Sequence, residues 1–129
     1  MGHMEHLNVM IADDSSLATK QLREIIELLG HVVVFSAKTG YEALKNYEVY
    51  HPDIVTMDIT MPDMDGIEAT KRIIERFPDA VIIMVTAHGQ EKMVVDALAE
   101  GARGYVLKPI RMASLKSSID KALQIKRGA

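Results

Sequence analysis

Five short apolar runs rich in β-branched residues alternate with five segments of helical periodicity along this chain of 129 residues. The runs are residues 7–12, 31–36, 53–58, 80–86 and 104–108. Strict alternation of strands and helices predicts βαβ units, in which neighbouring strands are parallel. The run 80–86 is almost wholly apolar, as expected of a strand covered by helices on both faces. We therefore expect an α/β fold of the (βα)5 type, with a doubly wound five-stranded parallel sheet.

The segments between these runs carry signals for the beginnings and ends of helices. Thr39 and Glu42 have the spacing of a capping box, which satisfies free backbone N–H groups in a first helical turn. Gly30 and Gly101 follow the first and fourth helical segments, and glycine commonly ends a helix. Asp65 is expected to cap the third helix. The apolar positions that mark the fourth helix are Met93, Val94, Ala97 and Leu98.

Composition limits the protein to a few classes. A hydrophobic content of 48% and a charged content of 26% fit one compact domain, which we place at residues 4–129, with residues 1–3 interpreted as left over from recombinant expression. Cysteine is absent, and a net charge of −3 without a basic stripe is unfavourable for nucleic-acid binding. No apolar stretch approaches the roughly 20 residues of a membrane span. We expect a cytoplasmic protein with no nucleic-acid or membrane partner.

Polar residues stand at or just after the ends of four apolar runs. In a doubly wound sheet, ligands bind outside the carboxyl ends of the strands. The order 2-1-3-4-5 makes strands 1, 3, 4 and 5 neighbours, so side chains at their ends fall along one edge, roughly 4.8 Å apart per strand. A single cluster is therefore expected from the residues Asp13, Asp14, Asp58, Thr86 and Lys108.

The chemistry of such a cluster favours phosphate. Three crowded carboxylates raise one another's pKa unless a cation neutralises them. Lys108 supplies one positive charge, and Mg²⁺ suits the remaining oxygen ligands because it typically binds one or two carboxylates, waters and a phosphate oxygen. An ionised Asp58 is then a candidate nucleophile toward phosphorus, and Thr86 a candidate donor to the new phosphoryl group. Singly, each residue has a plainer explanation, such as a helix cap or a solvated lysine; four coincidences at four strand ends favour a site.

The chain from residue 7 to about residue 125 resembles the receiver domains of two-component response regulators, in particular the freestanding chemotaxis (CheY-like) type, which has a flavodoxin-like fold. The family's Asp-x-x-Met-Pro-x-x-Asp-Gly loop is matched by residues 58–66, Asp-Ile-Thr-Met-Pro-Asp-Met-Asp-Gly. The resemblance implies phosphorylation of Asp58, direct Mg²⁺ ligation by Asp14, Asp58 and the Thr60 carbonyl, and a largely water-mediated role for Asp13. It also implies a cis Lys108–Pro109 peptide bond.

The resemblance also implies a conformational switch and two residues that affect the rate of dephosphorylation. Phosphorylation would draw Thr86 toward the phosphoryl group, and Tyr105 would fill the vacated space and alter the surface of the fourth helix, fifth strand and fifth helix. The alternative for Tyr105 is a half-buried strand residue. Thr60 and His88 would influence access of the hydrolytic water. His88 could shield the acyl phosphate, hydrogen-bond a phosphoryl oxygen or simply be solvated.

The function expected from the resemblance is phosphoryl transfer from the phosphohistidine of a sensor kinase, followed by binding of a downstream protein through that altered surface, in chemotaxis. A phosphatase is a further candidate partner, and the chain would catalyse only its own modification. One alternative is a phosphorelay intermediate that passes the group to a histidine phosphotransfer protein. A Mg²⁺-dependent phosphohydrolase of the haloacid dehalogenase type would need an aspartate where Thr60 stands. A flavin carrier would need a phosphate-binding loop after the first strand, which the sequence lacks.

Overall fold

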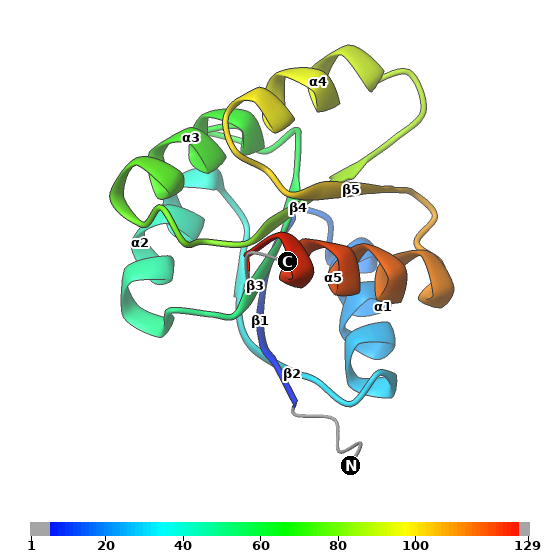
Figure 1. Cartoon of the computed structure of the whole chain (residues 1–129). Helices are drawn as coiled ribbons and strands as arrows, with labels where there is room; N and C mark the ends of the chain where they lie inside the picture. Colours follow the sequence, from blue (N-terminus) through cyan, green and yellow to red (C-terminus); the bar gives the residue numbers. More distant parts are fainter. Residues whose placement is uncertain (1–5, 127–129) are drawn as a thin grey trace.

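The computed structural model describes residues 6–126, where five strands alternate with five helices (Figure 1). Residues 1–3, interpreted above as left over from expression, lie outside this range. The strands are β1 (Asn8–Ala12), β2 (Val32–Ala37), β3 (Ile54–Asp58), β4 (Ile82–Thr86) and β5 (Gly104–Leu107). The helices are α1 (Ser16–Leu28), α2 (Gly40–Tyr50), α3 (Gly66–Arg76), α4 (Glu91–Ala99) and α5 (Met112–Lys126).

The sheet has the order β2-β1-β3-β4-β5, and every strand pair is parallel, which confirms the predicted doubly wound, flavodoxin-like (βα)5 fold. The register aligns the carboxyl ends of the central strands, because Asp58 pairs with Val85 and Thr86 pairs with Leu107. The last residues of β3 and β4 therefore reach the same edge. This alignment allows distant parts of the sequence to form one site.

Helices cover both faces of the sheet (Figure 1), and an apolar layer on each face packs against them. Alternate strand residues point to opposite faces, so Met57 packs toward α2, α3 and α4, whereas Ile54 packs toward α1 and α5. Both faces of β3 and β4 are fully buried. The continuous apolar runs in the sequence follow directly from this burial.

The helix signals are confirmed, with one variation. Asp65 caps α3 by accepting from the Glu68 N–H at 2.9 Å, and Gly30 and Gly101 adopt the positive φ expected of helix stops. Thr39 caps α2 by accepting from the Glu42 N–H, but the Glu42 carboxylate reaches the N–H of the preceding Lys38. The fourth helix is confirmed as α4, and its apolar residues divide between the core and the surface. Val94 and Ala97 are buried, but Met93 and Leu98 are 44% and 41% exposed, because this short helix lies on the sheet through a single narrow stripe.

No helix within residues 6–126 is long and apolar enough to cross a lipid bilayer.

Candidate functional site

Three carboxylates meet at the carboxyl edge of the sheet. Asp13 follows β1 directly and is completely buried, Asp14 is exposed, and Asp58 is the buried last residue of β3. Each contributes an oxygen to a group whose members all lie within 4.8 Å of one another. The acidic part of the cluster predicted from the strand ends is therefore present.

Lys108 is the cation of this cluster. Its Nζ lies 3.1 Å from Oδ2 of Asp13 and 3.6 Å from Oδ1 of Asp58. The Asp13 carboxylate is anchored through its other oxygen, Oδ1, which accepts from the Ser15 N–H at 2.9 Å. The contact with Lys108 is an ion pair without hydrogen-bond alignment, so the buried Asp13 Oδ2 accepts no hydrogen bond from any described residue. The ammonium of Lys108 thus contacts two of the three carboxylates of the cluster.

The electrostatic result is visible at Asp58, whose pKa is raised from 3.8 to about 6. Burial is the largest cause, the negative charge of Asp13 adds to it, and Asp14 contributes less. Lys108 and the Ile59 backbone N–H act in the opposite direction but do not cancel the effect. An acidic oxygen cluster with uncompensated charge and a buried oxygen free of hydrogen bonds is a donor set that fits a hard divalent cation.

Thr86 ends β4 at the same edge and is buried. Its hydroxyl donates to Oε1 of Gln90 at 3.0 Å and to the Ala87 carbonyl at 3.2 Å. Thr60 is exposed in the loop after β3, and its Oγ1 accepts from Nε2 of Gln90 at 3.2 Å. Sequence reasoning missed Gln90. Its only signal was its place before α4, where Ser, Thr, Asp or Asn is the usual cap.

The β3–α3 loop is held against Asp58 by its backbone. The Gly66 N–H donates to the Ile59 carbonyl at 2.7 Å, and a Cβ at Gly66 would collide with the carbonyl oxygen of Asp58. Only glycine allows this close approach. The Gly66 of the motif is therefore required for the position of Asp58. The Lys108–Pro109 peptide bond is cis, as the resemblance implied.

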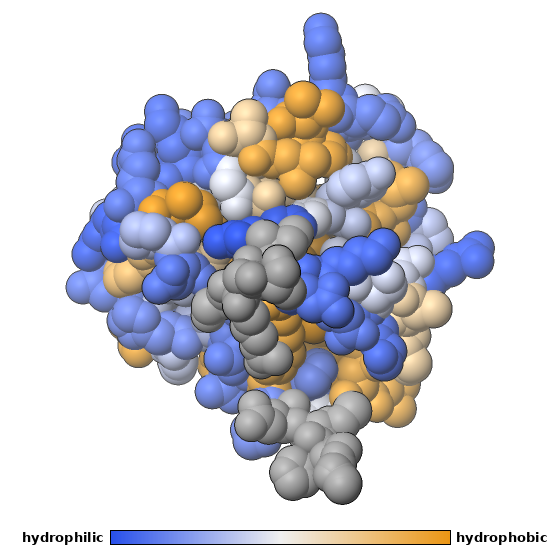
Figure 2. Space-filling model, in the orientation of Figure 1, coloured by the Kyte–Doolittle hydropathy of each residue, from blue (hydrophilic) through white to orange (hydrophobic). Residues whose placement is uncertain are grey.

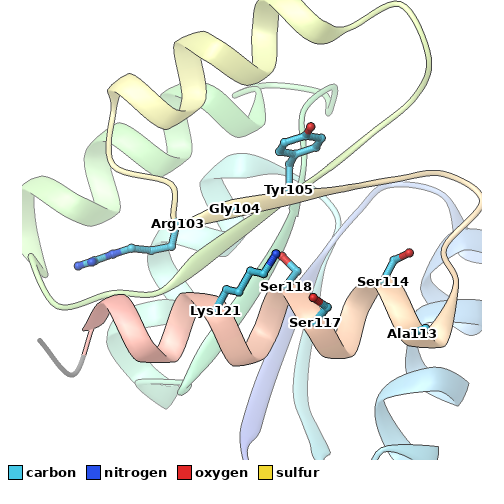
Figure 3. Close-up of a pocket in the computed structure, with 8 residues that line it drawn as sticks. All are labelled: Arg103, Gly104, Tyr105, Ala113, Ser114, Ser117, Ser118 and Lys121. Carbon is cyan, nitrogen blue, oxygen red and sulfur yellow. The ribbon is translucent and has the colours of Figure 1, made fainter. Parts of the chain in front are cut away.

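Tyr105 and His88 lie to the side of the cluster. Tyr105 is 51% exposed and rises from β5 on its α4 side, while Ser118 and Lys121 project from α5 into a hollow of about 560 Å³ (Figure 3). A second hollow of about 280 Å³ has both Tyr105 and Thr86 in its wall. His88 is exposed in the loop after β4 and lines a third hollow together with Lys108. Figure 2 shows an apolar patch over α4, where Val95 is also exposed.

A doubly wound sheet whose carboxyl edge carries an acidic cluster, a lysine and a threonine defines a receiver-type signalling domain. The chain belongs to the response regulator receiver domain family, whose family model matches residues 9–120.

Relatives of the CheY type match almost the whole chain. It is 40% identical to the chemotaxis protein CheY of Listeria monocytogenes over 116 residues, covering 90% of this chain and 98% of that protein. Identity to CheY of Thermotoga maritima is 41% over 113 residues, covering 88% and 94%. Among solved structures, a CheX–CheY–BeF3–Mg²⁺ complex from Borrelia burgdorferi matches with a TM-score of 0.85 and 38% identity, covering 90% of this chain and 88% of that one. The chain is therefore a CheY-like receiver domain.

Proposed function

We propose that this protein is a single-domain response regulator of chemotaxis that accepts a phosphoryl group on Asp58 from the phosphohistidine of a sensor kinase. The observation that carries the proposal is the position of Asp58, at the end of a buried strand, beside Lys108 and two further carboxylates. The similarity to chemotaxis proteins supports the cellular role. We place the protein in the cytoplasm, where sensor kinases present their phosphohistidine, with no nucleic-acid or membrane partner.

In the proposed transfer, a carboxylate oxygen of Asp58 attacks phosphorus and forms the O–P bond of an aspartyl phosphate. The P–N bond to the donor imidazole breaks, and its electron pair stays on the nitrogen. Lys108 stands 3.6 Å from Oδ1 of Asp58, where its ammonium is placed to stabilise charge on the phosphoryl oxygens. Thr86 donates its hydroxyl to one of these oxygens in the product.

Mg²⁺ is the cation proposed for the acidic cluster, with Asp14, Asp58 and the Thr60 carbonyl as ligands and Asp13 acting largely through water. When bound, it supplies the positive charge that offsets the carboxylates and the incoming phosphoryl group. Asp13 supports the arrangement by holding Lys108 at 3.1 Å. The Borrelia burgdorferi complex, which holds BeF3 and Mg²⁺, is consistent with this choice of ion.

The output is binding of a downstream protein through the face formed by α4, β5 and α5, governed by Thr86 and Tyr105. Support comes from the 280 Å³ hollow between them, which leaves room for the Tyr105 ring to move inward. The test is partner binding by Tyr105→Ala with and without phosphorylation, where loss of the difference is expected. If phosphorylation changes partner binding by Tyr105→Ala as much as it does in the wild type, this role for Tyr105 is excluded.

Thr60 and His88 are proposed to set the lifetime of the aspartyl phosphate, since both flank the site in exposed loops. The protein catalyses its own dephosphorylation and acts on no other substrate, with a phosphatase as a further candidate partner. Measured decay rates of the His88→Ala and Thr60→Ala phosphoproteins test this assignment. Decay at the wild-type rate in both variants would contradict it.

The central test is incubation with acetyl phosphate and Mg²⁺, followed by mass spectrometry for an acid-stable, base-labile phosphoryl adduct. We expect one adduct in the wild type and none in Asp58→Asn. An adduct that survives in this variant would refute Asp58 as acceptor. Pull-down with a flagellar motor-switch protein or with a histidine phosphotransfer protein then separates a chemotaxis regulator from a phosphorelay intermediate.

A further inference from the structure

Gln90 connects the two loops that flank the acidic cluster. Its Oε1 accepts from the Ala87 N–H at 2.8 Å and from the Thr86 hydroxyl at 3.0 Å. Its Nε2 donates to Oγ1 of Thr60 at 3.2 Å, across to the loop that follows Asp58. Gln90 occupies the N-cap position of α4, yet its side chain makes no capping hydrogen bond there. The amide therefore bonds mainly to the two loops, and its one contact with the helix is a long one of 4.0 Å from Nε2 to Sδ of Met93.

The hydrogen-bond partners fix the direction of each donor. A backbone N–H can only donate, so the amide atom that faces Ala87 is the oxygen. The Thr86 hydroxyl has one proton, and both of its partners, Oε1 of Gln90 and the carbonyl of Ala87, can only accept. That proton is thus committed to the β4–α4 loop and is not available to an acceptor on Asp58.

We propose that Gln90 is a positioning residue that holds the Thr86 hydroxyl in a resting arrangement, which must break before Thr86 can donate to a phosphoryl group on Asp58. The inference rests on the proposed phosphorylation of Asp58. A phosphoryl oxygen is a charged acceptor and forms a stronger hydrogen bond than the neutral amide oxygen of Gln90. Phosphorylation therefore draws the hydroxyl away from Gln90.

The hydrogen bond from the Thr86 hydroxyl to Gln90 biases the equilibrium toward the resting state, because it exists only in that state. Thr86 is buried, so a hydroxyl that loses Gln90 keeps only the more distant Ala87 carbonyl in that arrangement. The Ala87 and Thr60 contacts of Gln90 do not involve the hydroxyl and can persist in both states. A contact made in one state alone shifts a two-state equilibrium by its net free energy. Removing it should favour the active arrangement.

The experiment compares Gln90→Met, which keeps the length of the side chain but has no amide, with the wild type. Beryllofluoride with Mg²⁺ is the probe, titrated into protein whose threonine methyl groups carry ¹³C, so that the Thr86 methyl resonance reports binding. We expect about 5-fold tighter binding in Gln90→Met, equivalent to about 1 kcal/mol. Without the probe, its Thr86 methyl resonance should already move toward the bound position. Gln21→Met, on the exposed side of α1, is the matched control and should change neither value.

A second pair of variants tests whether the effect passes through the hydroxyl. In Thr86→Val, which removes the hydroxyl at constant shape, binding is followed through the methyl resonance of Thr60. Adding Gln90→Met to this variant should change beryllofluoride affinity by less than about 2-fold. A full 5-fold gain in this background, or unchanged or weaker binding by Gln90→Met alone, would overturn the inference. If the wild type itself binds no beryllofluoride, the proposed phosphorylation of Asp58 fails. Wild-type binding without any effect of Gln90→Met defeats only the role of Gln90.

Discussion

Replacement of Asp58 by asparagine should stabilise the protein at neutral and alkaline pH when divalent cations are absent. The folded-state pKa of Asp58 is about 6, against 3.8 for an ordinary aspartate. The folded protein therefore binds a proton at Asp58 more tightly than the unfolded chain does. The associated stability is fully present below about pH 4 and is lost as pH rises through about 6. Above that value the folded state carries an unfavourable charge that asparagine lacks.

The magnitude follows from the shift. A difference of about 2 pH units corresponds to about 3 kcal/mol at 1.36 kcal/mol per unit. Solvent near the mouth of the cluster screens part of this, so we expect the free energy of unfolding to rise by about 1–2 kcal/mol. Lys108 still has a partner in the variant, because its contact with Asp13 is the shorter of its two ion pairs.

Urea unfolding in the presence of a chelator, at about pH 8 and about pH 4, measures the effect. The difference between Asp58→Asn and wild type should be present at the higher pH and nearly absent at the lower. Glu24→Gln, on the exposed face of α1, controls for the loss of a carboxylate as such. An Asp58→Asn variant no more stable than wild type at about pH 8, or equally stabilised at both pH values, would refute the electrostatic reasoning.

Three further substitutions test other parts of the site. Thr56→Val should raise the free energy of unfolding by about 1 kcal/mol in urea titration, because the buried Thr56 hydroxyl has no hydrogen-bond partner among the described residues. Gly66→Ala should lower it by about 2–3 kcal/mol and reduce phosphorylation by acetyl phosphate, since its Cβ meets the carbonyl of Asp58. Lys108→Met should cost about 2–3 kcal/mol at about pH 8, because Asp13 and Asp58 lose their cation. The cost should be smaller at about pH 5, because Asp58, with a pKa of about 6, is then protonated. A pH-independent loss in Lys108→Met, or wild-type values for the other two, would contradict these assignments.

The fold was predictable because the helix and strand signals are local in the sequence and the strand order of a doubly wound sheet is regular. Strand periodicity places each strand within a residue or two, and helical periodicity, together with signals such as Gly30 and Gly101, places the helices between them. The order of a doubly wound sheet then brings the ends of β1, β3, β4 and β5 together without any side-chain detail. Asp13, Asp58 and Lys108 could be grouped on this basis alone.

The details that sequence reasoning missed depend on side-chain direction. Met93 and Leu98 fit the helical period of α4, but the period does not say how wide a stripe the sheet can cover. Gln90 was missed because its side chain joins the end of β4 and the loop after it to the loop after β3, whose approach is set by the register of β3 against β4. Loop-to-loop contacts of this kind follow from tertiary structure and have no periodic signature.

The instability at Asp58, which burial causes first, and the affinity of the cluster for a cation should both depend on the repulsion among its carboxylates. The charges of Asp13 and Asp14 that raise the pKa of Asp58 are the charges that a divalent cation would offset. A ligand that binds only the folded state stabilises it in proportion to the logarithm of its concentration above the dissociation constant. Saturating Mg²⁺ should therefore stabilise the wild type more than Asp58→Asn and narrow the difference between them at about pH 8. Equal stabilisation of both proteins would mean that Asp58 takes no part in holding the ion.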